Sequence, residues 1–264
     1  TIGGGEIRID AEEIHHTGEM RADGDQGGKI ELNAATQHLA GEVTATGEAG
    51  DGGALAVNAH TLRVDEAPLD VSGVDAGGRM ALNAESVLVS GALAAAAEEG
   101  DGGLTAIRAG ALRLDDAQLD VSGLSAGGRI ALGAVASLGL TAPGVPEGSS
   151  AEDRSPAPMP DTPPAPAPGE VILTNSTVSS RSRRGEGGDL ILTGDHISLS
   201  DNSTLTATGA SGGGAILVGG DWQGQGNLPQ ATTVTIDDSV TLDASATAQG
   251  DGGTIVAWSD ITNA

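Results

Sequence analysis

Residues 50–84 read GDGGALAVNAHTLRVDEAPLDVSGVDAGGRMALNA, and residues 100–134 repeat that pattern as GDGGLTAIRAGALRLDDAQLDVSGLSAGGRIALGA. The second glycine of each Gly-Gly pair returns every 25 residues, at Gly28, Gly53, Gly78, Gly103 and Gly128. Later pairs end at Gly188, Gly214 and Gly253. A constant period of about 20–50 residues is the sequence signature of a solenoid. We therefore expect short repeats stacked into a rod.

Each 25-residue unit contains three apolar-x-apolar pairs, which after Gly53 are Leu55, Val57, Leu62, Val64, Leu69 and Val71. Such a pair places two side chains on one face of a strand. Glycine and short polar residues between the pairs are expected to supply unusual backbone angles at corners. The sequence predicts an all-β fold, a three-sided parallel β-helix with three short strands per coil and about eight to nine coils. A β-sandwich with many short strands is the alternative, but a β-sandwich gives no reason for successive units to keep a constant spacing of 25 residues.

Composition supports a thin core and narrows the range of functions. The chain has no Phe or Tyr, only two Trp, and 43 Gly. Its net charge of −25 opposes binding of nucleic acid or anionic lipid. Because it has no Cys, it has no disulfide scaffold, thiolate metal site or cysteine nucleophile. No apolar run reaches the length of a membrane-spanning helix, so we expect neither nucleic acid as a partner nor membrane insertion.

Two stretches interrupt the period. Residues 143–169 are rich in proline and are expected to form a flexible loop insertion. Residues 219–231 are expected to form a second, shorter loop insertion after the first strand of their coil. Loops that leave a regular scaffold often carry binding function.

The C-terminal third resembles a known family through three runs: GGDWQG at 219–224, LDASA at 242–246 and GDGGTIVAWSD at 250–260. They resemble the repeat, or shaft, region of filamentous haemagglutinin-like large exoproteins and adhesins of the two-partner (type Vb) secretion family. The resemblance implies a right-handed parallel β-helix and secretion to the bacterial cell surface through an outer-membrane transporter. It also implies adhesion, a role in biofilm matrix or contact-dependent competition. Residues 1–264 are then a single β-helix segment of a larger protein.

Charged residues recur at twice the glycine period. Arg63 and Arg113, Asp65 and Asp115, Asp70 and Asp120, and Arg79 and Arg129 are each separated by 50 residues, with Leu88, Ser90, Ala95 and Leu104 at the matching places between them. Two coils correspond to roughly 10 Å. The spacing predicts a rod that avoids ladders of like charge.

Several residues are candidates for binding. Asp51, Asp101 and Asp251 precede glycine pairs and are calcium candidates, although the nine-residue repeat of the calcium β-roll is missing and acids that cap or solvate a corner are favoured. His15 and His38 are expected to stack outward, in a column that continues as Arg63. The binding-loop candidates are Asp221, Trp222, Arg181, Arg183 and Arg184.

The tryptophan and arginine candidates each have a structural role as an alternative to binding. Trp222 could form a sugar-stacking platform, but covering the side of a coil is favoured for both Trp222 and Trp258. The arginines are expected to offset nearby acids or to contact the proline-rich loop. The chain shows no nucleophile motif and no clustered pair of carboxylates, so it is not expected to be an enzyme or to need a cofactor.

The sequence as a whole predicts a non-catalytic structural or adhesive shaft that contacts host or matrix glycan or neighbouring copies of itself. A self-assembling extracellular filament subunit is one alternative. A polysaccharide-processing β-helix enzyme is the other.

Overall fold

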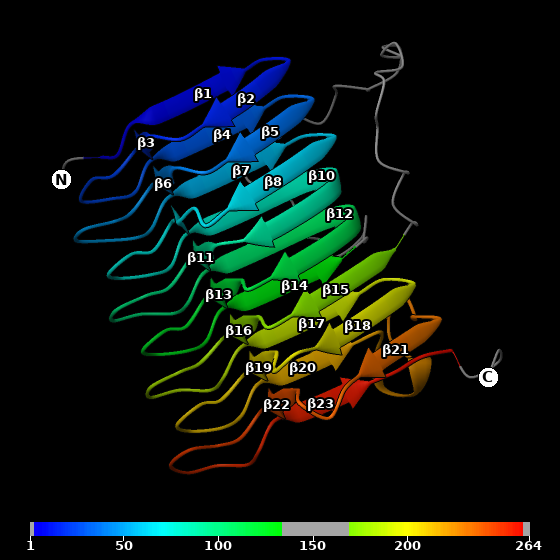
Figure 1. Ribbon diagram of the computed structural model, residues 1–264. Coiled ribbons are helices and arrows are strands. Elements are labelled where there is room, and N and C mark those ends of the chain that lie inside the picture. The colour runs from blue at the N-terminus through cyan, green and yellow to red at the C-terminus, as the bar shows by residue number, and fades with distance from the viewer. Residues whose placement is uncertain (1–2, 134–168, 261–264) are drawn as a thin grey trace, which may run out of the picture.

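The computed structural model describes residues 3–133 and 169–260. Its strands stack along one axis as a parallel β-solenoid, with the two ends of the chain at opposite ends of the stack (Figure 1). Within the described ranges the one helical element is the short 3₁₀ turn η1 (Trp222–Gly224). The predicted all-β repeat architecture is therefore confirmed.

Each coil has three walls. Wall 1 contains β1 (Glu6–Asp10), β4 (Lys29–Asn33), β7 (Ala54–Asn58), β10 (Arg79–Ser90), β12 (Leu104–Asp115), β14 (Arg129–Gly133), β17 (Asp189–Thr193), β20 (Ala215–Val218) and β23 (Thr254–Ala257). Wall 2 contains β2 (Glu13–His16), β5 (Thr36–Leu39), β8 (Thr61–Asp65), the second halves of β10 and β12, β15 (Glu170–Thr174), β18 (His196–Ser200) and β21 (Thr233–Ile236). Wall 3 contains β3 (Glu19–Arg21), β6 (Glu42–Thr44), β9 (Leu69–Asp70), β11 (Ala92–Ala94), β13 (Gln118–Asp120), β16 (Thr177–Ser179), β19 (Thr204–Thr206) and β22 (Thr241–Asp243).

We name the corners by the walls they join: corner 1 joins walls 1 and 2, corner 2 joins walls 2 and 3, and corner 3 leads to the next coil. Strands β10 and β12 run through corner 1 without a break, so walls 1 and 2 form one 15-stranded sheet while wall 3 is a separate 8-stranded sheet. The described chain contains eight wall-3 strands and a ninth wall-1 strand after them, in agreement with the predicted number of coils.

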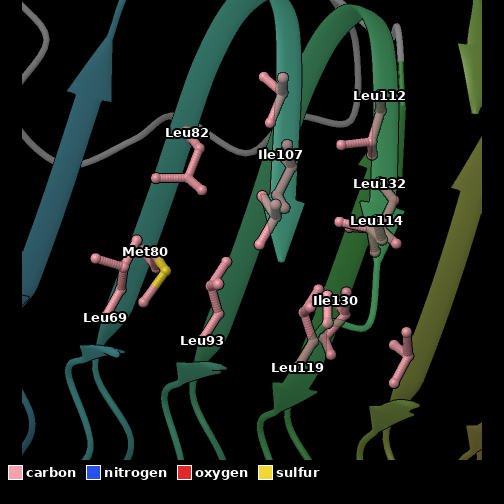
Figure 2. Close-up of a cluster of buried hydrophobic side chains, with 14 of the residues drawn as sticks. Leu69, Met80, Leu82, Leu93, Ile107, Leu112, Leu114, Leu119, Ile130 and Leu132 are labelled. Atoms are coloured by element: carbon pink, nitrogen blue, oxygen red, sulfur yellow. The ribbon is translucent and has the colours of Figure 1, made fainter. Parts of the chain in front are cut away.

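The interior is filled by the residues that the sequence pattern placed there. Leu55, Val57, Leu62, Val64, Leu69 and Val71 are all at most 2% exposed. Equivalent residues of successive coils are register partners, as for Leu82 and Ile107 on wall 1. Figure 2 shows how these leucine, isoleucine and methionine side chains gather between the walls. Small and branched side chains thus form a continuous apolar column without Phe or Tyr.

The glycine pairs lie at corner 3, where the coils approach each other most closely. A Cβ added to Gly103 would lie 2.1 Å from the Gly78 carbonyl oxygen, and one added to Gly128 would lie 2.1 Å from the Gly103 oxygen. Neither of these glycines has a left-handed φ. The prediction that glycine and short polar residues between the apolar pairs supply unusual backbone angles therefore fails for these paired glycines, whose role is to leave room for the backbone of the adjacent coil. It is confirmed for Asp116 and Asn175 at corner 2, which have left-handed φ angles.

Corner 2 varies in length from coil to coil. Glu66 and Asp116 adopt left-handed φ angles of 50° and 56° there. The coil between them has one residue fewer, so that Ser90 and Gly91 lead directly into β11. A compensating residue at corner 3 restores the period, and wall 3 of this coil is therefore shifted by one residue.

Both predicted insertions begin at corner 1. The second insertion, residues 219–231, lies between β20 and β21 as expected and contains η1. The proline-rich insertion falls between β14 and β15, but its residues 143–168 lie outside the described ranges.

Candidate interaction surfaces

One position at corner 3 carries an acidic residue in every second coil. Consecutive bridge partners there are Asp51, Ala76, Asp101 and Ala126, and Glu186 pairs with Gly212. The Gly213 amide donates to the Asp251 carbonyl, which continues the same row. The row, which we call the acid row, therefore alternates an acid with a small neutral residue.

A parallel row of cations begins three residues further along the chain. Lys29 pairs with Ala54, Ala54 with Arg79, Arg79 with Leu104 and Leu104 with Arg129. The cations of this cation row lie in those coils whose acid-row position is neutral. Within each row, charges of the same sign are therefore separated by a coil whose residue at that position is neutral.

The predicted two-coil rhythm is confirmed for the repeated residues of walls 2 and 3, although Glu19 and Glu42 are direct register partners in adjacent coils of wall 3. Leu88 pairs with both Arg63 and Arg113 on wall 2, and Ser90 pairs with Asp65. The residue predicted to lie between Asp70 and Asp120 was wrong.

On wall 3 the residue between Asp70 and Asp120 is Ala94. The sequence had predicted Ala95, which is instead fully buried. The shorter corner 2 of that coil shifts its register by one residue.

An open groove of about 530 Å³ follows corner 3 and is lined by the glycine pairs. Arg79, Asp101, Arg129 and Glu186 are among the side chains that line it. Arg79 makes no ion pair with a described residue, whereas Arg129 contacts Asp189 at 2.5 Å. The groove therefore presents both signs of charge along its length.

The calcium candidates lie apart in this groove. Asp51 and Asp101 are separated by one coil, in which Ala76 holds the same position, a spacing of roughly 10 Å. Their carboxylates, like that of Asp251, are exposed and make no hydrogen bond with the described residues, so they do not cap the corner. In residues 3–133 and 169–260, no three His, Asp or Glu side chains gather as a metal site would require.

The histidine column has the predicted register. His15 pairs with His38, and His38 pairs with Arg63. The two imidazole rings make an edge contact with centroids 5.8 Å apart. Each ring nitrogen Nε2 approaches a carboxylate, that of Glu13 at 2.7 Å and that of Asp65 at 2.8 Å. The column is thus held by hydrogen bonds and ring contact.

Hydrogen bonds shape the ionisation of the partly buried acids. The Arg63 guanidinium donates to Asp65 at 2.5 Å, which with His38 lowers the pKa of Asp65. Partial burial acts to raise the pKa of Asp23, but donors on Thr46 and Thr44 outweigh it and the pKa is lowered. Both groups therefore favour the ionised form at neutral pH.

The arginine candidates lie in the corner 3 loop between β16 and β17. Arg183 and Arg184 are exposed, and none of the three arginines forms an ion pair with a described residue. Arg181 donates a long hydrogen bond of 3.5 Å to the Thr206 hydroxyl. The expectation that these arginines offset nearby acids stays a prediction; Arg183 lines a surface pocket together with Glu48 and Glu98 but forms no ion pair with them. Their expected contact with residues 143–168 lies outside the described part of the chain.

Trp222 and Asp221 lie in the second insertion at corner 1, beside β21 (Figure 1). Trp222 is 66% exposed, so the prediction that it covers the side of a coil was wrong. Trp258 is half-buried, and its indole Nε1 donates to Gln230 Oε1 at 3.2 Å. Trp258 is therefore hydrogen-bonded to the insertion, whereas Trp222 faces solvent.

Nothing in the sequence signalled the role of Gln230. It lies eight residues after Trp222 and bonds to both Trp258 and the Gly224 carbonyl. A single amide in an irregular loop shows no periodicity, and only the proximity of the next coil reveals its partners.

Comparison with protein-family models, with curated proteins and with solved structures finds no match to this chain. Among the described residues, no helix combines the length and apolar character needed to cross a bilayer. The chain is thus characterised by its own geometry, which is that of a β-solenoid repeat protein.

Proposed function

We propose that this chain is the shaft of a secreted bacterial β-helical exoprotein and serves as a non-catalytic structural or adhesive spacer. The observation that supports the proposal is the apolar column that runs through the coils. The inward residues Ile30, Leu82, Ile130 and Ile216, which lie in four different coils, are fully buried. Because each coil is bonded to both neighbours along its walls, the rod resists bending and presents its corners at fixed intervals.

Secretion to the cell surface, export through an outer-membrane transporter and membership of the haemagglutinin-like exoproteins rest on the resemblance of residues 219–260. The net charge of −25 is compatible with such a location, since it keeps an extended rod solvated. The expected partners are host or matrix glycan, or neighbouring copies of the chain. Neither a cofactor nor calcium is part of the proposal.

A retention assay tests the adhesive role. Beads coated with the full chain are perfused over surfaces bearing matrix polysaccharide or host cells, and retention under flow is measured. Coated beads should be retained better than beads coated with Leu82→Asp, which places a charge in the column and should unfold neighbouring coils. Equal retention of the two bead types would defeat the adhesive proposal.

The two alternatives are tested separately. A filament subunit would form fibres whose length grows with protein concentration in electron microscopy, whereas a shaft would remain as isolated rods. A polysaccharide-processing enzyme would release reducing ends from an acidic polysaccharide, and such turnover would replace the non-catalytic proposal.

A further inference from the structure

The second insertion is a closed loop with a defined base. Strand β20 ends at Val218, and Gly219 and Gly220 turn the chain outward with φ angles of 77° and 140°. The Ala231 amide donates to the Gly219 carbonyl at 2.8 Å, and Ala231 itself is fully buried. Residues 219–231 therefore leave and rejoin corner 1 at nearly the same point; we call them the Trp222 loop.

Hydrogen bonds hold the interior of the Trp222 loop. Gln230 Nε2 donates to the Gly224 carbonyl at 3.0 Å, while Gln230 Oε1 accepts from the Trp258 indole. The Gly224 amide donates to the Asp221 carbonyl at 3.0 Å, which forms the 3₁₀ turn. The Asp221 carboxylate accepts a longer bond from the Leu228 amide at 3.4 Å. A loop fixed in this way loses little conformational entropy when it binds a ligand.

The loop exposes its aromatic side chain instead of burying it. Trp222 and Ile255 are the two exposed large hydrophobic residues of the described chain, and Ile255 is an inward-register residue of the last described strand. Trp222 has no such explanation. The adjacent Gln223 has a left-handed φ of 56°, a conformation that costs free energy in a residue other than glycine. The loop thus keeps a strained turn next to an indole that is not stabilised by burial in the core.

The surroundings of Trp222 indicate the chemistry of its ligand. Gln223, Gln225 and Asn227 follow Trp222 in the loop with exposed side chains, and each amide can both donate and accept a hydrogen bond. Gln225 Nε2 donates a long bond of 3.4 Å to Gln223 Oε1. Residues 219–231 contain no Lys or Arg, and their one ionisable side chain is Asp221. A negatively charged ligand would find no counter-ion in the loop and would be repelled by the acidic rod.

A neutral hexopyranose matches this surface. One face of such a sugar ring presents polarised C–H groups, which the electron-rich face of an indole attracts, and its rim presents hydroxyls for the amides. We propose that the Trp222 loop is a binding site for neutral glycans, in which Trp222 stacks on a hexopyranose ring and the amides of the loop bond to its hydroxyls. This inference rests on the proposed adhesive function, for which it names the ligand class.

A glycan array probed with the full chain tests the proposal. The array presents neutral hexose oligosaccharides, hexuronate polymers, sulfated glycans and sialylated glycans. We expect neutral oligosaccharides to bind, Trp222→Ala to weaken their binding by at least about tenfold, and Trp222→Tyr to retain part of it. Ile255→Ala removes the other exposed large hydrophobic side chain and should bind as the unchanged protein does. Circular dichroism and the urea midpoint should be the same for Trp222→Ala as for the parent.

Other outcomes overturn the site. Binding of charged glycans alone, binding that survives Trp222→Ala, or no glycan binding would each refute it. Trp222-dependent binding to phosphatidylcholine vesicles without glycan binding would assign the loop to a membrane surface instead. If bead retention persists while neutral glycans fail to bind, the loop proposal fails and the adhesive function stands. The reverse result would refute the adhesive function alone.

Discussion

Replacing Gly102 with alanine tests whether the glycine pairs exist for close approach between coils. An added Cβ at Gly102 would lie 1.7 Å from the Val121 carbonyl oxygen and 2.6 Å from the Gly128 nitrogen, both backbone atoms of the next coil. Gly252 holds the same position in its repeat, but the nearest atom to its added Cβ is 4.0 Å away. Gly252→Ala is therefore a matched control that lacks the steric conflict.

The expected cost follows from the distance that the coils must move. An ordinary contact of roughly 3.5 Å requires a local separation of about 1.8 Å. That movement would break the hydrogen bond from Gly102 N to the Ala126 carbonyl and the one from Arg129 N to the Gly103 carbonyl, which are 3.0 and 2.9 Å long. With about 1 kcal/mol for each bond and about 1–3 kcal/mol of overpacking strain, Gly102→Ala should destabilise the chain by about 3–5 kcal/mol. Gly252→Ala should change stability by no more than about 1 kcal/mol, in the stabilising direction.

Urea unfolding followed by far-ultraviolet circular dichroism measures the effect over the whole rod. Tryptophan fluorescence would report only on the C-terminal coils that hold Trp222 and Trp258. Because solenoids can unfold in segments, midpoints are compared in place of extrapolated free energies. The midpoint should fall clearly for Gly102→Ala only, with a melting temperature lower by roughly 10 °C. Equal shifts in the two variants would refute the steric explanation and return the glycines to a role in backbone flexibility.

Three further substitutions probe the core, the charge spacing and an acid. Thr105→Val removes a buried hydroxyl that has no hydrogen-bond partner among the described residues. It should raise the free energy of unfolding by about 1 kcal/mol, which a higher urea midpoint would show; a lower midpoint would contradict this. Ser90→Asp fills the neutral place beside Asp65 and should cost about 0.5–1 kcal/mol relative to Ser90→Asn at low salt. A difference that persists unchanged at about 1 M salt, where the screening length is roughly 3 Å, would argue against charge repulsion. The pKa of Asp23 is lowered from 3.8, so its ionised form stabilises the fold above that pH and this stabilisation is lost as the pH falls through the folded pKa. Unfolding measured from about pH 7 down to about pH 2 should show the gap between the parent and Asp23→Asn closing in acid, and a gap that widens would be inconsistent with a lowered pKa.

The repeat period and the inward residues could be read from the sequence because both depend on local pattern. Alternation such as Leu55-x-Val57 places side chains on one face of a strand wherever the strand lies. A period that holds its phase through several units admits few folds other than a stack. The charge spacing between Arg63 and Arg113 was also accessible, since it needed only the coil length.

The exposure of Trp222 and the hydrogen bonds of Gln230 that hold its loop could not be predicted from the sequence in this way. Whether an indole in an irregular loop folds back on the coil depends on Gln230 and Trp258, which are separated by 28 residues and meet only because consecutive coils are adjacent.

The sequence by itself determined the coil length, the three inward strand segments and the two places where the period breaks, because these follow from the order of apolar and glycine residues. Only the tertiary structure decided why the glycines are there. The space available to a Cβ at Gly103 is set by a carbonyl 25 residues earlier, at Gly78, and that separation between coils exists only once the rod is stacked.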